Sequence, residues 1–239
     1  PPPTLPATTV QQSLPRVVMR IVYAACGSRG DTQGAIAFAV EVRRLPIGVL
    51  AFGCARAAST LAPSTRRWPS QLVRAGHELR LYIAPEYLSL VPTVAGLSVI
   101  GSQQTVAASM DKIAPHIATG KTGAMLKALV ETQIEFFARE ANALKAACDG
   151  WAEILIVNAV ADAMGFAVTE ALHIKALIAN VQPQLPTREL FPMSGSLKLP
   201  KFMHMFIWWL FWEKITLPKS LRHEIDKWKA ANGTHRPSS

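Results

Sequence analysis

Cysteine is scarce in this 239-residue chain, which contains only three. Cys26, Cys54 and Cys148 are not spaced as a disulfide framework or a zinc site requires, and we exclude both kinds of site. The histidines also lack the spacing of metal ligands, so no metal site is predicted. A chain without disulfides is typical of a reducing compartment, and we therefore expect a cytoplasmic protein.

Charged side chains are few, at 17% of the residues, whereas half of the residues are apolar. This composition excludes a disordered protein, and the length allows one large domain or two small ones. Lys and Arg outnumber Asp and Glu by 25 to 16. The excess favours an anionic partner, such as nucleic acid, a phosphate-bearing substrate or an acidic membrane surface. Because the basic residues are scattered, they do not select one of these.

Secretory and standard nucleotide-binding motifs are also missing. Residues 1–18 are rich in Pro, Thr and Gln and contain no apolar segment of signal-peptide length. We interpret them as a disordered extension, with the domain beginning at Met19. The glycines of "GSRGDTQG" do not have the spacing of a dinucleotide-binding loop or a P-loop. "GKTG" at residues 120–123 follows no strand and is interpreted as a loop that starts a helix.

Strand-like and helix-like segments alternate along the rest of the chain. The expected strands are residues 20–25, 77–84, 97–101, 152–159 and 175–183, and the expected helical segments are 32–44, 85–96, 109–148 and 161–174. This alternation predicts an α/β fold, a Rossmann-like parallel sheet with helices on both faces. Ligands of such sheets bind beyond the carboxyl ends of the strands. The segment "CGSRGDTQG", residues 26–34, is therefore predicted to lie on the functional edge.

Residues 45–70 interrupt this alternation. They are rich in Pro, Ser, Ala and Arg, and the segments on either side of them would together form one helix of ordinary length that ends at Gly76. Two explanations stay open. The segment is either an insertion foreign to the fold, from a retained non-coding segment or a frame error, or a genuine excursion of the chain.

Four ordered blocks resemble the amino-terminal domain of family 28 glycosyltransferases, which have the GT-B fold and include sterol 3-β-glucosyltransferases and mycobacterial and antibiotic glycosyltransferases. The blocks are "GSRGDTQ" at residues 27–33, "RAGHELRL" at 74–81, the segment 152–192 and the tryptophan-bearing segment 209–229. The chain departs from the family pattern at Gly34 and at Lys175, where that pattern has proline.

The resemblance implies a hexosyltransferase fragment. Residues 19–200 would form the acceptor domain and residues 201–232 its closing helices, with the carboxyl-terminal donor domain absent, so the chain alone is expected to be inactive. The implied partners are a nucleotide-sugar, UDP- or dTDP-hexose, and an apolar hydroxylated acceptor such as a lipid or sterol; neither a cofactor nor nucleic acid is implied. Two other classes stay open: a stand-alone binding module for a hydrophobic small molecule, and a nonfunctional truncated gene product.

Asp31 is the candidate catalytic base. An inverting sugar transfer needs a base that removes the acceptor proton and polar groups that stabilise the departing diphosphate. Asp31 stands at a predicted helix start, where the helix dipole favours its ionised form, although such an aspartate can also be a simple helix cap. The resemblance assigns donor binding to Ser28, Arg29, Gly30 and Asp31.

The candidates for acceptor binding are Gln33, Arg188, Trp208 and Trp209. Arg188 follows a predicted strand and could equally form a surface ion pair. The apolar segment 202–212 is too short to span a bilayer. It is either a core helix or a helix that lines the acceptor site or contacts a membrane surface peripherally. Glu170 is expected to have a packing or hydrogen-bonding role.

Overall fold

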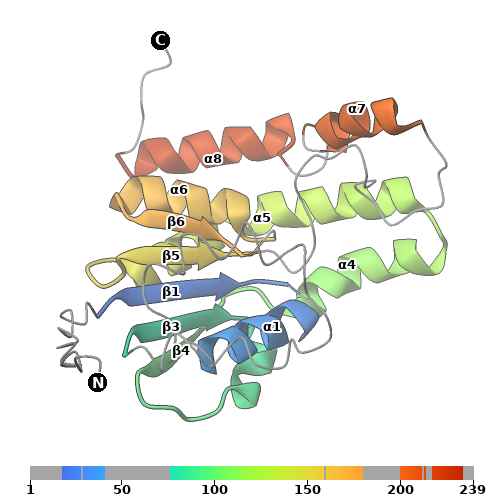
Figure 1. Ribbon diagram of the computed structural model, residues 1–239. Helices are drawn as coiled ribbons and strands as arrows, with labels where there is room; N and C mark the ends of the chain where they lie inside the picture. The colour runs from blue at the N-terminus through green and yellow to red at the C-terminus, as the bar shows by residue number, and fades with distance from the viewer. Residues whose placement is uncertain are drawn as a thin grey trace, which may run out of the picture.

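The computed structural model describes residues 18–27, 29–40, 76–158, 160–179, 200–211, 213 and 217–233. These residues contain a five-stranded parallel sheet with the strand order β4-β3-β1-β5-β6 (Figure 1). The strands are β1 (Arg20–Ala25), β3 (Glu78–Ile83), β4 (Leu97–Gly101), β5 (Ile154–Val157) and β6 (Lys175–Ile178). The helices are α1 (Arg29–Val40), η3 (Pro85–Leu90), α4 (Val106–Ala118), α5 (Thr122–Cys148), α6 (Asp162–Leu172), α7 (Lys201–Phe211) and α8 (Lys219–Ala231). The predicted Rossmann-like α/β fold is confirmed.

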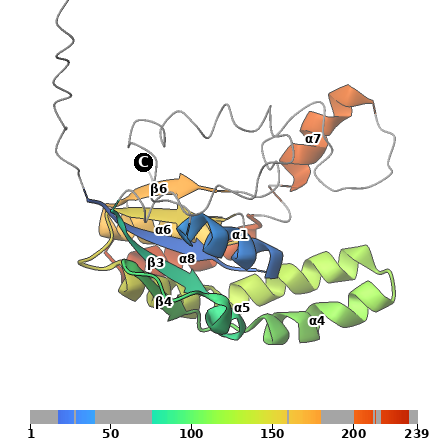
Figure 2. The same ribbon diagram turned by 60° about the horizontal axis from the view of Figure 1, so that its bottom comes forward.

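Helices cover both faces of the sheet, as Figure 2 shows for α1 on one side and for α6 and α8 on the other. Successive side chains of a strand point to opposite faces. Ile21 and Tyr23 of β1 accordingly belong to the core under α1. Val22 and Ala24 belong to the second core, which α5, α6 and α8 close. The helices on this second face bring Trp228 of α8 against the same core.

Strand β1 occupies the centre of the sheet. From β1 the chain continues to β3 and β4 on one side and later to β5 and β6 on the other. The sheet therefore reverses its strand order between β1 and β5, and the crevice at the carboxyl ends of these two strands is where open α/β sheets bind their ligands. Segment 26–34 directly follows β1, so the sheet places it at this crevice as predicted.

The predicted helical segment 109–148 is two helices. Helix α4 ends at Ala118, and α5 begins at Thr122. Gly120 between them has a φ angle of 64°, which suits glycine. The prediction that 120–123 starts a helix is confirmed. Both views show α4 and α5 extending past the carboxyl ends of the strands (Figures 1 and 2).

The expected helix over residues 85–96 is wrong in its second half. The structure has a short 3-10 helix that ends at Leu90. Pro92 disfavours helical backbone at the residue before it, and Val91 is extended, with φ of −83° and ψ of 121°. The strand that we expect over residues 175–183 is shorter in the structure, where β6 ends at Ile178.

Some predictions fall outside the described residues. They include the extension up to residue 17 and the segment 45–70. Gly76, which was expected to end a helix, has a φ angle of 85°, a conformation suited to glycine. The helix that would precede it lies outside the described residues. The proposed domain boundaries therefore stay predictions.

Candidate functional site

The loops after β1 and β5 are joined by a side chain. Asn158 directly follows β5 and is only 4% exposed. Its Nδ2 donates a hydrogen bond to the carbonyl oxygen of Cys26, at 2.5 Å, and its Oδ1 accepts one from the backbone N–H of Ala161, at 3.3 Å. Asn158 thereby holds the two sides of the crevice together. Asn158 is not among the residues predicted from the sequence, although an asparagine directly after a buried strand at the functional edge is a visible signal.

Asp31 lies in the first turn of α1, against the loop that follows β1. Its Oδ2 is 2.8 Å from the position that a Cβ atom would occupy on Gly27, and Gly27 has a φ angle of 123°. Burial, followed by the charge of Asp31, raises the pKa of Tyr23 in β1 to about 12. The carboxyl group of Asp31 therefore lies between the crevice and the start of the core under α1.

The other predicted donor residues share this helix turn. Arg29 and Gly30 are the first two residues of α1, and Arg29 is exposed. Gln33, a candidate for acceptor binding, is also exposed, one turn further along. Ser28 lies outside the described residues. The structure thus brings Arg29, Gly30 and Asp31 together at the crevice, while their proposed contacts with a donor stay predictions.

A cavity of about 280 Å³ opens beside this crevice. Its lining comes from the loops after β1, β3, β4 and β5, from α4 and α5, from the start of α6, and from Leu221 of α8. Apolar side chains predominate, among them Met110, Leu129 and Phe136. Gly27 belongs to the same lining. Gly27 lies next to Asp31, but Asp31 itself, like Arg29 and Gln33, is not among the described residues that line the cavity.

Glu140 is the most unusual polar residue of this cavity. Its side chain is on α5 and is 5% exposed. The hydroxyl group of Tyr82 donates a hydrogen bond to Oε2 of Glu140, at 2.6 Å. Within the described part of the chain, Oε1 has no hydrogen-bond partner. Burial raises the pKa of Glu140, and the Tyr82 hydroxyl, the charge of Arg139 and the backbone N–H groups of Gln103 and Gln104 act against this rise without a hydrogen bond to Oε1. Burial raises the pKa of Tyr82 as well.

Asp162 is a second buried carboxyl group of the cavity. It begins α6, is 9% exposed, and accepts a hydrogen bond from the backbone N–H of Ala163 at 2.6 Å. Burial raises its pKa to about 6. Burial also raises the pKa of the neighbouring Cys26 thiol to about 12, which makes a reactive thiolate unfavourable. Among the described residues, no Lys, Arg or His lines the cavity.

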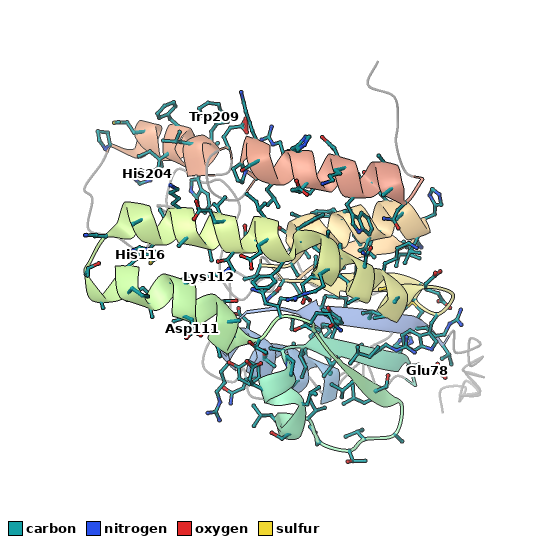
Figure 3. All side chains as sticks on the ribbon, turned by 180° about the vertical axis from the view of Figure 1, so that it is seen from behind. Glu78, Asp111, Lys112, His116, His204 and Trp209 are labelled. Atoms are coloured by element: carbon teal, nitrogen blue, oxygen red, sulfur yellow. The ribbon has the colours of Figure 1, made fainter. Side chains whose placement is uncertain are left out.

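Helix α7 presents two different faces. Trp208 is 2% exposed, whereas Trp209 is 57% exposed and stacks at a tilt on the exposed ring of Phe206. Figure 3 shows Trp209 on the side of α7 away from α5. The face of α7 that carries Trp208 therefore fits the predicted core helix. The face that carries Trp209 fits the alternative, a helix whose apolar side chains lie on the surface. Neither tryptophan lines the described cavity, and their acceptor role stays a prediction.

The remaining sequence candidates have separate positions. Arg188 lies outside the described residues. Glu170 of α6 forms an ion pair with Lys229 of α8, which agrees with the hydrogen-bonding alternative of its expected role. In the described ranges, no group of His, Cys, Asp and Glu side chains could hold a metal ion. No helix in the same ranges has the length and apolar character needed to cross a bilayer.

No family model matches the chain, and no curated protein matches it. Among solved structures it is similar to the spinosyn rhamnosyltransferase SpnG, at 13% identity and a TM-score of 0.42. It is also similar to the calicheamicin glycosyltransferase CalG4, at 12% identity and a TM-score of 0.46. Each match covers 92% of this chain and 43% of the other chain. The chain thus spans less than half the length of either protein.

Proposed function

We propose that this chain is the acceptor-binding half of an inverting glycosyltransferase. The complete enzyme would transfer a hexose from UDP or dTDP to a hydroxyl group of an apolar acceptor. The observation that carries the proposal is the position of Asp31, which lies at the amino end of α1 and against Gly27 of the β1 loop. The resemblance of "GSRGDTQ" to the family 28 motif supplies the reaction class.

The geometry suits general-base catalysis. Asp31 places a carboxyl group in the first turn of α1, next to Gly27 of the loop after β1. An acceptor hydroxyl that reaches the Gly27 end of the cavity would arrive beside Asp31, which would take its proton as the oxygen attacks the sugar carbon. The exposed Arg29 and the backbone N–H groups at the start of α1 are suited to oxygens of the departing diphosphate.

The cavity suits the acceptor. Its volume of about 280 Å³ is close to the lower limit of about 300 Å³ for small-molecule pockets. Apolar side chains with a few buried polar groups are the usual lining of such pockets. A neutral, ring-bearing alcohol is therefore a suitable occupant, and a lipid or sterol acceptor remains part of the proposal.

The test uses a two-domain protein, in which the chain is joined after residue 232 to the carboxyl-terminal domain of a GT-B glycosyltransferase. Asp31→Asn keeps the size and most of the capping ability of the side chain but removes the base. We expect turnover to fall by about a hundredfold or more, with donor affinity nearly unchanged. Asp226→Asn on the exposed side of α8 is the matched control. Normal turnover in Asp31→Asn would limit Asp31 to helix capping.

The second candidate is a stand-alone binding module for an apolar small molecule. The cavity favours it, because a ligand site of this kind needs no second domain. This candidate predicts binding without sugar transfer, even in the two-domain protein. Transfer by the two-domain protein would eliminate it, whereas transfer by the isolated chain would show that the donor site lies within these 239 residues.

A further inference from the structure

Two buried acceptor oxygens on α5 have no hydrogen-bond donor. They are Oε1 of Glu140 and Oε1 of Gln133, neither of which has a partner within the described residues. Both residues line the cavity. A buried polar atom without a partner is costly to a fold. A ligand that supplies donors inside the cavity would remove this cost.

The spacing of the two residues defines the kind of ligand. Seven positions are about two turns of a helix, so Gln133 and Glu140 lie on the same face of α5, about 10 Å apart along its axis. Leu129 and Phe136 belong to the same stripe and also line the cavity. The α5 wall is therefore apolar, with an acceptor oxygen at each of two points.

The charges of the cavity add a second restriction. Asp162 faces the same space as Glu140, and the described lining contains no basic side chain. The hydroxyl group of Tyr82 already donates to the other oxygen of Glu140, so it does not neutralise a bound anion. The charge of Arg139 acts on Glu140, but Arg139 is exposed and does not belong to the described lining. An anionic ligand would lie beside two carboxyl groups in a lining without basic side chains, which is unfavourable in a buried site.

We propose that the cavity selects an uncharged apolar molecule with hydroxyl groups at both ends, one of which donates to Glu140 and the other to Gln133. Glu140 and Gln133 are then specificity-determining residues. The identification of this molecule as a sugar acceptor rests on the proposed function, whereas its binding does not.

The experiment is calorimetric titration of the full chain, at pH 8, with three rigid probes. The probes are biphenyl-4,4′-diol, biphenyl-4-ol and biphenyl-4-carboxylate, which share one apolar body and differ only at its ends. We expect the diol to bind at least threefold more tightly than the mono-alcohol, and the carboxylate at least tenfold more weakly than the mono-alcohol. Equal affinities for the three probes, or no binding of any of them, would overturn the proposal.

Two variants separate the two oxygens. Gln133→Leu removes one acceptor and is expected to abolish the advantage of the diol while leaving mono-alcohol affinity within about twofold. Glu140→Gln removes one acidic group but leaves an oxygen for the Tyr82 hydroxyl, and it is expected to tighten carboxylate binding at least fivefold. Glu131→Gln removes the same charge from the exposed side of α5 and should change none of these ratios.

The outcomes distinguish this inference from the proposed function. If the probes bind with the expected selectivity but the two-domain protein transfers no sugar, the assignment of the cavity is supported. The bound molecule is then not a sugar acceptor. Transfer to an acceptor with unchanged selectivity in Gln133→Leu and Glu140→Gln would support the enzyme and overturn the assignment of these two residues. Thermal unfolding of each variant verifies that it is folded.

Discussion

Oδ2 of Asp31 lies 2.8 Å from the position that a Cβ atom would occupy on Gly27. The carboxyl group of Asp31 therefore occupies the space that a side chain on residue 27 would need. Gly27 also has a φ angle of 123°, which residues with a side chain rarely adopt. We predict that Gly27→Ala displaces the Asp31 carboxyl group and strains the loop. The free energy of unfolding should fall by about 1–3 kcal/mol, measured by urea denaturation, and transfer by the two-domain protein should fall with it.

Gly150→Ala is the control for this prediction. Gly150 also has a positive φ angle, of 62°, but an added Cβ would meet no atom within 4 Å. Its loss of stability should be limited to the conformational cost of about 1–2 kcal/mol, without an effect on transfer. If both alanine variants lost transfer equally, backbone strain alone would explain the result, and the contact of Gly27 with Asp31 would have no catalytic meaning.

Gly165 of α6 allows the helix to lie close to β5. A Cβ on this glycine would overlap the side chain of Val157, including a separation of only 3.2 Å from its Cβ. Gly165→Ala should therefore destabilise the fold by about 1–3 kcal/mol, despite the better helix propensity of alanine. Gly123→Ala in α5 meets no atom within 4 Å, and should be neutral or stabilising by up to about 1 kcal/mol. Thermal denaturation of the two variants measures the difference in their stability. Equal melting temperatures would contradict the close packing of α6 on β5.

Asp162 should make the fold less stable as the pH rises. Its pKa is raised from 3.8 to about 6 in the folded state, so the folded protein holds this proton more tightly than the unfolded chain does. The stabilisation is complete below pH 3.8 and is lost as the pH rises through about 6. Integrated over this range, the loss is roughly 3 kcal/mol.

Asp162→Asn should remove that loss. The stability of the variant relative to the original protein should increase between pH 4 and pH 7, as measured by urea denaturation at each pH. His77 acts in the opposite direction, because burial lowers its pKa and acidification below about pH 6.5 then costs stability, but it is present in both proteins and cancels in the difference. A difference that does not vary with pH would contradict the raised pKa.

Deletion of residues 45–70 tests whether this segment is foreign to the fold. If α1 and the segment before β3 belong to one helix, the deletion rejoins them and should leave stability unchanged or raised, because a long loop adds little beyond its closure entropy. The measurement is the cooperativity and midpoint of unfolding. Loss of cooperative unfolding would show that the segment is a structural part of the domain.

Local patterns predicted most of the architecture. The expected strand 20–25 coincides with β1, and the expected strand 97–101 with β4. Alternating strand and helix segments leave few arrangements other than a parallel sheet. The carboxyl ends of parallel strands meet at one edge, so this pattern also predicted that segment 26–34 lies on the functional edge.

The cavity depended on tertiary structure. Tyr82 and Glu140 are 58 positions apart, and Cys26 and Asn158 are 132 positions apart. No local pattern indicates that these groups meet, because their hydrogen bonds exist only after α5 packs on the sheet and the two central strands align. In sequence, Glu140 is one of several charged residues of a long helix.

The sequence by itself determined where the chain forms strands and helices, and it located the glycine-rich motif at the end of the first strand, because both follow from the properties of neighbouring residues. Only the tertiary structure decided which polar groups are buried and which of them lack partners. Burial and desolvation arise from the packing of segments distant in sequence. Asp31 is therefore predictable from the sequence, whereas Glu140 is recognisable as a site residue only in the folded structure.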